Sequence, residues 1–281
     1  MRNINEDSIT QAVIGAMAGC KNPRLLSVMT SLVQHLHAFA REVALTEDEW
    51  FEGIKFLTAA GNISDDKRQE FIPLSDVLGL STLVTAQNNL KPEGCTESTV
   101  FGPFFVDGAP KFDNGDDIAN GAKGTPCFVR GTVKSLDGRP IAGAVIDVWQ
   151  SDEEGFYDVQ SPIASGEHEH RARGQLRSDA EGGFNFRSIL AHHYPIPHDG
   201  PVGAMLDALD RHPWRPAHLH FMIEAPGHER LITHIFREGG EYLDSDAVFG
   251  VRGSLIVDWP RQEGGFHTLD HDFVLNPVAA P

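Results

Sequence analysis

Cysteine is scarce in this sequence of 281 residues. Only Cys20, Cys95 and Cys127 occur, and their odd number and wide spacing exclude a disulfide framework and a cysteine-based zinc motif. Free cysteines are typical of a reducing compartment. The first residues lack the apolar run of a secretory signal, and no run approaches the roughly 18 apolar residues of a membrane span. We therefore expect a cytoplasmic protein.

Positively charged side chains are also few. The chain carries 23 lysines and arginines against 40 aspartates and glutamates, a formal net charge of −17. Nucleic acid and anionic membranes would be repelled, so neither is expected as the main partner. An anionic small molecule is not excluded, because a metal ion or a local cation can invert the potential at one site. Internal repeats and glycine-rich nucleotide-binding loops are missing as well.

Roughly the first 90 residues have the period of helices. Asn22 and Pro23 form a start signal, a cap followed by a first-turn proline. Apolar side chains then recur at spacings of 4, 3, 4, 3 and 4, at Leu25, Met29, Leu32, Leu36, Phe39 and Val43. We name these six residues the apolar stripe. It predicts either the core of an intramolecular bundle or an interface between two copies of the chain.

Two further helical stretches are expected before residue 90. Thr46 and Glu49 make a capping box, which opens a helix that ends near Gly61. Another helical stretch is expected over residues 66–89, bent at Pro73. From residue 91 to residue 125 glycines interrupt a segment with little periodicity, which predicts loop and linker.

Beyond residue 125 the pattern is that of strands. Short runs rich in Val, Ile, Phe and Trp cover residues 127–134, 144–150, 174–178, 183–188, 217–224, 231–236, 255–258 and 273–275. Turn signals such as DGRP at 137–140 divide them. The patterns together predict an α+β protein, in which a helical N-terminal domain over residues 1–95 precedes an antiparallel β-sandwich over residues 96–281.

Two histidines on one strand face are the most informative feature of the chain. In the run 217–223 the odd positions are apolar, whereas His218 and His220 occupy even positions. The apolar face can pack a core, so both imidazoles project together to the other side. Two imidazoles on one face are half of a mononuclear metal site.

Other histidine pairs fit a metal site less well. His168 and His170 lie in a charged run with no apolar opposite face, and the adjacent His192 and His193 would point to opposite sides of a strand. The nearby carboxylates do not complete a pattern of two histidines and one carboxylate either.

Tyrosine is the remaining anionic donor, and the chain has only three. Tyr157 follows the strand expected to end at residue 150, and Tyr194 lies in a loop stiffened by two prolines. A phenol, with a pKa of about 10, stays protonated in a neutral pocket, but a trivalent cation would deprotonate it. Either both tyrosines bind such an ion or they are ordinary half-buried aromatic residues. The pattern alone leaves both possibilities open.

Several motifs taken together resemble the intradiol ring-cleavage dioxygenases, ferric enzymes that split an aromatic ring between two adjacent hydroxyls. The motifs are RPAHLHF at 215–221, GFY at 155–157, YP at 194–195, VFGPF at 100–104 and the hairpin at 131–140. The resemblance extends over most of the chain. HPW at 212–214 and YLDSDAVFGV at 242–251 are most similar to hydroxyquinol-cleaving members, and catechol-cleaving members are the alternative.

The resemblance implies which residues act. Tyr157, Tyr194, His218 and His220 would bind one Fe(III), with water or hydroxide in a remaining position. Two phenolates and one hydroxide neutralise the ion, which a buried site tolerates. Tyr194 would leave the metal and accept a proton when a diol dianion binds. Arg215 would stabilise the charge that develops on the bound ring.

The resemblance also implies a substrate pocket. The matching positions are Asp76, Val100, Phe101, Gly102, Pro103, Phe104, Ile196, Pro197, His234 and Val248. Asp76 would hydrogen-bond the third hydroxyl of hydroxyquinol, and His234 stands where catechol-cleaving members commonly carry glutamine. Pro73 stands where an aliphatic pocket residue is expected.

The expected reaction and partners follow from the same resemblance. Hydroxyquinol and O2 would give 3-hydroxy-cis,cis-muconate, the enol form of maleylacetate, in aromatic compound catabolism. Family members pair through the helical region and often hold a phospholipid there, so a homodimer is expected. Two alternatives remain. The hairpin rhythm of residues 131–144 also occurs in metal-free, transthyretin-like binding modules, and a zinc hydrolase could use the histidine pair with a carboxylate.

Overall fold

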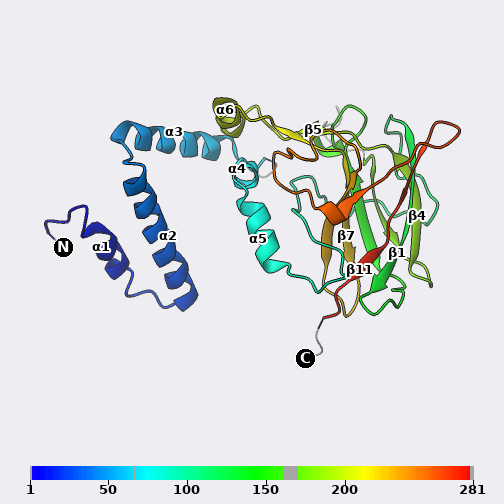
Figure 1. Ribbon diagram of the computed structural model, residues 1–281, viewed down its shortest axis with the longest axis horizontal. Helices are drawn as coiled ribbons and strands as arrows, with labels where there is room; N and C mark the ends of the chain where they lie inside the picture. Colours follow the sequence, from blue (N-terminus) through cyan, green and yellow to red (C-terminus); the bar gives the residue numbers. More distant parts are fainter. Residues whose placement is uncertain (1, 66–67, 161–169, 279–281) are drawn as a thin grey trace. The chain divides into compact units, whose positions relative to one another are not determined.

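The computed structural model describes residues 2–65, 68–160 and 170–278 (Figure 1). Contacts divide the chain into two compact units, Met1–Asn62 and Ile63–Pro281. Helices α4 and α5 group with the sheets by this criterion. The division predicted at residue 95 follows them in the sequence, and it stays a prediction.

The first unit is helical and contains α1 (Ile9–Ala16), α2 (Pro23–Glu42) and most of α3 (Glu47–Ile63). The predicted start of α2 is confirmed, because the Asn22 side chain accepts a hydrogen bond from the Leu25 N–H at 3.1 Å. The capping box of α3 is also present, with the Thr46 N–H donating to Glu49 Oε2 at 2.9 Å. Both helices therefore begin where local sequence signals placed them.

The stretch 66–89 is divided into two helices, α4 (Phe71–Val77) and α5 (Leu80–Asn88). The predicted bend at Pro73 is wrong, since Pro73 lies in the first turn of α4, where its missing N–H costs no intrahelical bond. The break comes at Gly79, whose φ of 74° is left-handed and ends the helical backbone. Residues 66–67 lie outside the described ranges.

Two sheets and a short ribbon form the rest of the second unit, together with helix α6 (Pro201–Ala208). The first sheet consists of β1 (Pro126–Ser135), β4 (Gly183–Ile189), β10 (His267–Asp270) and β11 (Phe273–Leu275). The second has the order β3 (Arg173–Arg177), β2 (Val145–Gln150), β7 (His218–Glu224), β8 (Leu231–Arg237) and β9 (Ile256–Val257). The ribbon pairs β5 (Tyr194–Pro195) with β6 (Trp214–Arg215). Figure 1 shows β1, β4 and β7 in the layered part of this unit.

All eight expected strands are present, and β5, β6 and β10 were not expected. The central pairs, such as β2 with β7 and β7 with β8, are antiparallel as predicted. Three peripheral pairs are parallel, namely β1 with β10, β1 with β11 and β8 with β9. The α+β class is confirmed, and the sandwich is mixed at its edges.

One apolar core lies between the two sheets and orients β7. Val129 and Phe184 from the first sheet join Ile146 and Phe221 from the second in this core. Leu219, Phe221 and Ile223 of β7 all belong to it, so the apolar face of β7 is oriented as its alternation predicted. His218 and His220 therefore project from the other face. Among the described residues no helix is long and apolar enough to cross a membrane.

Candidate metal and substrate site

The site is built on the polar face of β7, where His218 and His220 are almost completely buried. Their Nε2 atoms lie 3.0 Å apart, and the Tyr157 hydroxyl lies 2.8 Å from His220 Nε2. His218 Nδ1 lies 2.8 Å from the Pro216 carbonyl, a partner that places the proton on Nδ1 and the lone pair on Nε2. Lone pairs of two imidazoles and a phenol oxygen thus meet at one point.

Tyr157 reaches this point from the loop between β2 and β3. The Asp152 carboxylate accepts hydrogen bonds from the Glu154 and Phe156 backbone N–H groups, which folds the loop into a turn. Gly155 completes the turn with a φ of 84°. A Cβ at this glycine would lie 3.2 Å from the Tyr194 Cβ. A side chain here would therefore push apart the two tyrosine-bearing segments.

Tyr194 lies on the ribbon, directly opposite Arg215. The Arg215 Nη1 donates to the Tyr194 hydroxyl at 3.2 Å and lies 3.4 Å from His218 Nε2. The ring centroids of Tyr194 and Tyr157 are 5.0 Å apart, with a T-shaped arrangement. The structure therefore brings together all five residues expected at the centre: Tyr157, Tyr194, Arg215, His218 and His220.

Arg215 is held by a buried carboxylate. Its Nε donates to Asp246 Oδ1 at 3.0 Å and its Nη2 to Asp246 Oδ2 at 3.3 Å. Asp246 also accepts a hydrogen bond from the Gly250 N–H at 2.8 Å. Burial opposes the charge of Arg215, but Asp246 raises its pKa above the ordinary value. Arg215 thus presents a fixed positive charge beside Tyr194.

The donor set fits a hard metal cation. Burial first, and then the neighbouring histidine rings and Arg215, hold the pKa of His218 and His220 well below its ordinary value, so both imidazoles are neutral. Neutral imidazole is the form that binds metals. Burial raises the pKa of Tyr157 well above its ordinary range, so a nearby cation is needed to make its phenolate. A metal ion would satisfy the lone pairs that now face one another.

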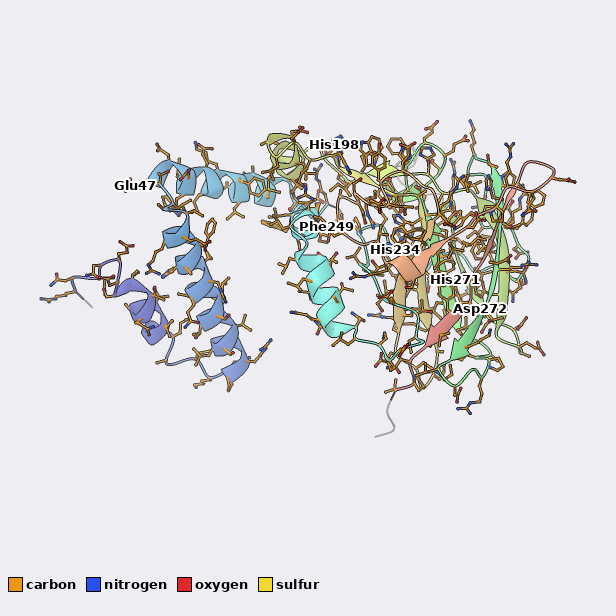
Figure 2. All side chains as sticks on the ribbon, viewed as in Figure 1. Glu47, His198, His234, Phe249, His271 and Asp272 are labelled. Atoms are coloured by element: carbon orange, nitrogen blue, oxygen red, sulfur yellow. The ribbon has the colours of Figure 1, made fainter. Side chains whose placement is uncertain are left out.

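A third imidazole, His234, lies beside the histidine pair on the neighbouring strand. Figure 2 shows it among the strands of the layered unit. Its ring stacks on His218 at a centroid distance of 4.5 Å, and the ring nitrogens of His218, His220 and His234 lie within 4.8 Å of one another. His234 is completely buried. His234 is thus a neighbour of the expected metal ligands.

A cavity of about 720 Å³ opens beside this centre. It is lined by most of the expected pocket residues: Asp76, Val100, Gly102, Pro103, Phe104, Ile196, Pro197 and Val248, together with Tyr194 and Arg215. Pro73 lines it as well. Phe101 and His234 are not among its lining residues; Phe101 packs on Phe105 and Trp149 instead. A substrate role for these two residues stays a prediction.

One cluster of charged residues in this cavity could not be predicted from the sequence. Arg68 donates to Asp199 at 2.8 Å and to the buried Glu70 at 3.0 Å, and all three residues line the cavity. Glu70 also accepts a hydrogen bond from the Val202 N–H at 3.0 Å, which joins α6 to the segment before α4. Arg68 and Asp199 are 131 positions apart, so only the folded chain brings them together.

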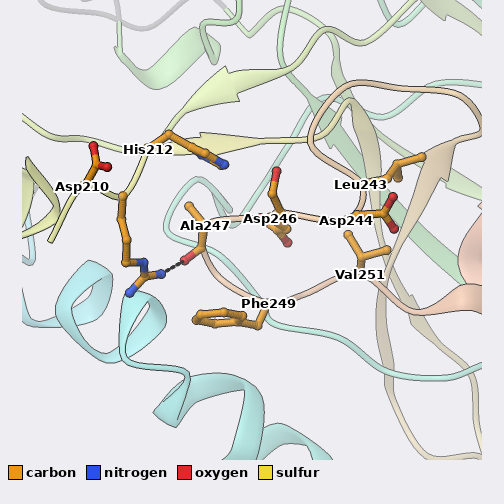
Figure 3. A pocket seen from close by; sticks show the side chains of 10 residues that line it. Asp210, His212, Leu243, Asp244, Asp246, Ala247, Phe249 and Val251 are labelled. Carbon is orange, nitrogen blue, oxygen red and sulfur yellow. Dashed lines mark hydrogen bonds between the residues drawn. The ribbon is translucent and has the colours of Figure 1, made fainter.

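A smaller cavity of about 450 Å³ is lined by Asp246 and its neighbours in the chain (Figure 3). Its lining includes Leu243, Asp244 and Phe249 but none of the expected metal ligands. Arg211 donates to the Ala247 carbonyl at 3.2 Å, the dashed contact in Figure 3. This cavity borders the loop that holds Arg215 and contributes no donor to the centre.

The remaining candidate side chains lie elsewhere or are inert. The rings of His192 and His193 contact each other at a centroid distance of 4.1 Å with a tilted arrangement, and His193 packs against Trp214 and Tyr242. His168 lies outside the described residues. Burial raises the pKa of the Cys127 thiol to about 12, so it stays protonated at neutral pH.

Comparisons with known proteins agree with this geometry. Residues 100–277 match the family described as dioxygenase, and residues 22–96 match the family described as catechol dioxygenase N terminus. The chain is 61% identical to the 6-chlorohydroxyquinol 1,2-dioxygenase of Cupriavidus pinatubonensis, over 99% of this chain and 100% of the relative. It is 51% identical to the hydroxyquinol 1,2-dioxygenase of Nocardioides simplex, over 94% of this chain and 88% of the relative.

Solved structures of hydroxyquinol and catechol dioxygenases are also similar to this chain. The chain superposes on hydroxyquinol 1,2-dioxygenase from Pseudomonas putida with a TM-score of 0.90 and 47% identity, over 97% of this chain and 99% of the other. Catechol 1,2-dioxygenase from Pseudomonas arvilla superposes with a TM-score of 0.81 and 29% identity, over 100% and 94% of the two chains.

Proposed function

Because the chain belongs to the intradiol ring-cleavage dioxygenases, we propose that it cleaves hydroxyquinol with O2 to 3-hydroxy-cis,cis-muconate, the enol form of maleylacetate. The observation that carries the proposal is the meeting of the Tyr157 oxygen with the Nε2 atoms of His218 and His220, beside a cavity that contains both Arg215 and Asp76. Membership of this family decides against a metal-free binding module and a zinc hydrolase.

The proposed metal is Fe(III), held by Tyr157, Tyr194, His218 and His220. Phenolate oxygen is a hard donor and suits a trivalent ion, and neutral imidazole completes the set. Bound there, ferric iron would chelate the two adjacent hydroxyl oxygens and withdraw electron density from the ring, which makes the ring reactive toward O2.

Arg215 is proposed to stabilise negative charge, and Tyr194 is proposed to accept a proton. The guanidinium, fixed by Asp246, donates to the Tyr194 hydroxyl at 3.2 Å. It can therefore stabilise negative charge on that oxygen or on a substrate oxygen in the same place. Tyr194 Oη would hold the proton that a hydroxyl of the substrate gives up on binding. The Tyr157 hydroxyl lies instead 2.8 Å from His220 Nε2, and its oxygen is proposed to stay a ligand throughout.

Asp76 is proposed to recognise the third hydroxyl of hydroxyquinol. It lines the cavity on α4, and its side chain is almost completely buried. Burial raises the pKa of Asp76 above its ordinary value, and the carboxyl oxygens can accept a hydrogen bond from a substrate hydroxyl. Catechol lacks the third hydroxyl and would not make this hydrogen bond to the buried carboxyl, which costs binding free energy.

The first experiment measures the visible absorption of the purified protein before and after anaerobic addition of hydroxyquinol. We expect a broad charge-transfer band that moves to longer wavelength with the diol. A colourless, iron-replete protein that the diol leaves unchanged would contradict the proposed ligands.

Tyr157→Phe should lose the band or the iron, and a variant that keeps both would remove Tyr157 from the ligand set.

Substrate preference is tested by O2 uptake with hydroxyquinol, 6-chlorohydroxyquinol and catechol. The kcat/KM ratio of hydroxyquinol to catechol should fall about 10- to 100-fold in Asp76→Ala, since one hydrogen bond to a charged or buried group is lost. Asp76→Asn keeps a hydrogen-bonding side chain and should fall less. Asp244→Ala removes a carboxylate from the second cavity and is the matched control. An unchanged ratio in Asp76→Ala would rule out this role.

We further propose that the apolar stripe of α2 forms a homodimer interface, with phospholipid tails covering part of it. Leu25, Leu32, Leu36, Phe39 and Val43 are each about half exposed, between 49% and 53%. A contiguous apolar surface of this kind is typical of an interaction site. Mass spectrometry of an organic extract of the purified protein tests for the lipid.

A further inference from the structure

A row of four buried side chains crosses the second sheet beside the proposed metal ligands. Arg173 on β3 faces Trp149 on β2, Trp149 faces His220 on β7, and His220 faces His234 on β8. Residues directly opposed on antiparallel strands point to the same side of a sheet. Each of the four is at most 1% exposed. Arg173 therefore lies on the metal side of the sheet, two strands from His220.

Trp149 connects the two ends of this row. Its ring stacks on His220 at a centroid distance of 4.7 Å and an interplanar angle of 18°. Its Nε1 is buried and has no hydrogen-bond partner among the described residues. The indole ring therefore fills the space between Arg173 and His220, and a shift of either neighbour is opposed by close packing.

Arg173 ends in a buried ion pair with Asp158. Its Nη2 donates to Asp158 Oδ1 at 2.6 Å and its Nε to Oδ2 at 3.0 Å, and the two side chains are 2% and 1% exposed. Asp158 also accepts hydrogen bonds from the backbone N–H groups of Val159 and Arg171. Asp158 directly follows Tyr157 in the chain. The ion pair therefore ties the Tyr157 loop to the row.

Tyr194 is held in a different way. Its strand β5 is only two residues long, and its hydroxyl contacts the guanidinium of Arg215. The residue that follows it is Pro195, whose ring has no charged group with which to form an ion pair. One tyrosine is thus tied to the sheet by an ion pair at the adjacent position, and the other is not.

Stability alone does not account for the Arg173–Asp158 pair. Burying two charges costs solvation free energy, and apolar side chains of similar size often stabilise a fold equally well. A buried pair next to a functional residue is better explained by the geometry that it fixes.

We propose that Arg173 is a positioning residue, whose ion pair with Asp158 holds the Tyr157 loop against the Trp149–His220 stack and keeps Tyr157 on the metal while Tyr194 leaves it. This inference rests on the proposed function, because it takes Tyr157 as a ligand. Partners of metal ligands typically change metal affinity 10- to 100-fold when they are mutated.

The test uses the iron-loaded protein and the double variant Arg173→Met/Asp158→Asn. Both charges are removed together, so no unpaired charge stays buried, and the new amide side chain keeps an oxygen for the backbone N–H groups. We expect iron to be released to a chelator about 10- to 100-fold faster than from the wild type, and the charge-transfer band of the substrate-free protein to shift. Arg130→Met, which breaks an exposed ion pair with Asp270 on β10, is the control and should change neither quantity.

A mutant cycle separates positioning from general damage to the fold. If the ion pair acts through Tyr157, then among Tyr157→Phe proteins reconstituted with excess iron the double variant should release iron no faster than Tyr157→Phe alone. Additive effects in the two backgrounds would overturn the inference. Arg173→Lys keeps the charge but loses the bidentate contact with Asp158, so it should release iron at a rate between those of the wild type and the double variant. It also serves as the decisive variant if the double variant does not fold, and wild-type release from it would then overturn the inference.

Failure of this inference is distinct from failure of the proposed function. A wild-type protein without the charge-transfer band would contradict the proposed ligands themselves. A wild-type protein with the band, together with a folded double variant whose band and iron release are unchanged, would contradict only the positioning role of Arg173.

Discussion

The two compact units use apolar side chains in opposite ways. In the second unit Phe221 is 1% exposed within a core that draws on both sheets, whereas Leu32 on α2 of the first unit is 49% exposed. None of the twenty residues of α2 is buried, although the spacing of its apolar residues is regular. Helical periodicity therefore identifies a face that needs a partner, and it does not say whether that partner is in the same chain.

The two units are also expected to differ in role, with catalysis in the second unit and association of chains through the first. The proposed ligands, Arg215 and the substrate cavity all lie in the second unit. Variants in the second unit should therefore change catalysis or stability, and variants on the apolar stripe should change association.

The largest effect is expected for His220→Ala. Removal of one of two imidazoles should abolish iron binding and measurable turnover, because the remaining donors no longer surround the metal. Iron content and O2 uptake are the measurements, and an unchanged circular dichroism spectrum would show that the fold persists. His35→Ala, an exposed histidine of α2, is the matched control in the other unit and should keep full activity. An active, iron-replete His220→Ala would remove it from the ligands.

The next largest effect is expected for Phe221→Ala, the neighbour of His220 on the opposite face of β7. Truncating this buried ring should lower the free energy of unfolding by about 3–5 kcal/mol, measured by denaturant titration. Phe128→Ala removes a ring that is 44% exposed and should cost about 1 kcal/mol or less. Equal losses for the two variants would contradict the assignment of the core to the space between the sheets.

A smaller effect on stability, but a clear effect on assembly, is expected for Leu32→Asp. A charge in the apolar stripe should prevent close packing of two helices and give monomers in sedimentation experiments. Gln34→Asp places the same charge on the polar side of α2 and should leave the oligomer intact. If Leu32→Asp has no effect on association, the stripe is not the interface.

The smallest effect is expected for Asn22→Ala. Loss of the cap on the Leu25 N–H should destabilise α2 by about 1 kcal/mol, which amide hydrogen exchange in its first turn would report. Ser31→Ala, in the middle of the same helix, lacks a capping role and should change exchange little. Protection that is unaltered in Asn22→Ala would mean that tertiary contacts, and not the cap, hold the start of the helix.

Elements that depend on neighbouring residues could be predicted from the sequence. The start of α2 at Pro23, the capping box of α3 and the alternation of β7 all follow from rules that act within a few positions. The break at Gly79 was missed, because a glycine inside a helical pattern is often tolerated and only its left-handed φ ends the helix. Strand β10 was missed, and the parallel pairing of the short strands β9 and β11 was not predicted, because these strands are only two to four residues long.

Local patterns in the chain specified which side chains could form a metal site: two histidines on one strand face and two scarce tyrosines in loops. How these side chains meet depends on the folded chain. The row from Arg173 through Trp149 to His220, and the contact of Arg68 with Asp199, join residues that are tens of positions or more apart. Strand register and loop closure depend on long-range packing, which is why no local pattern specifies them.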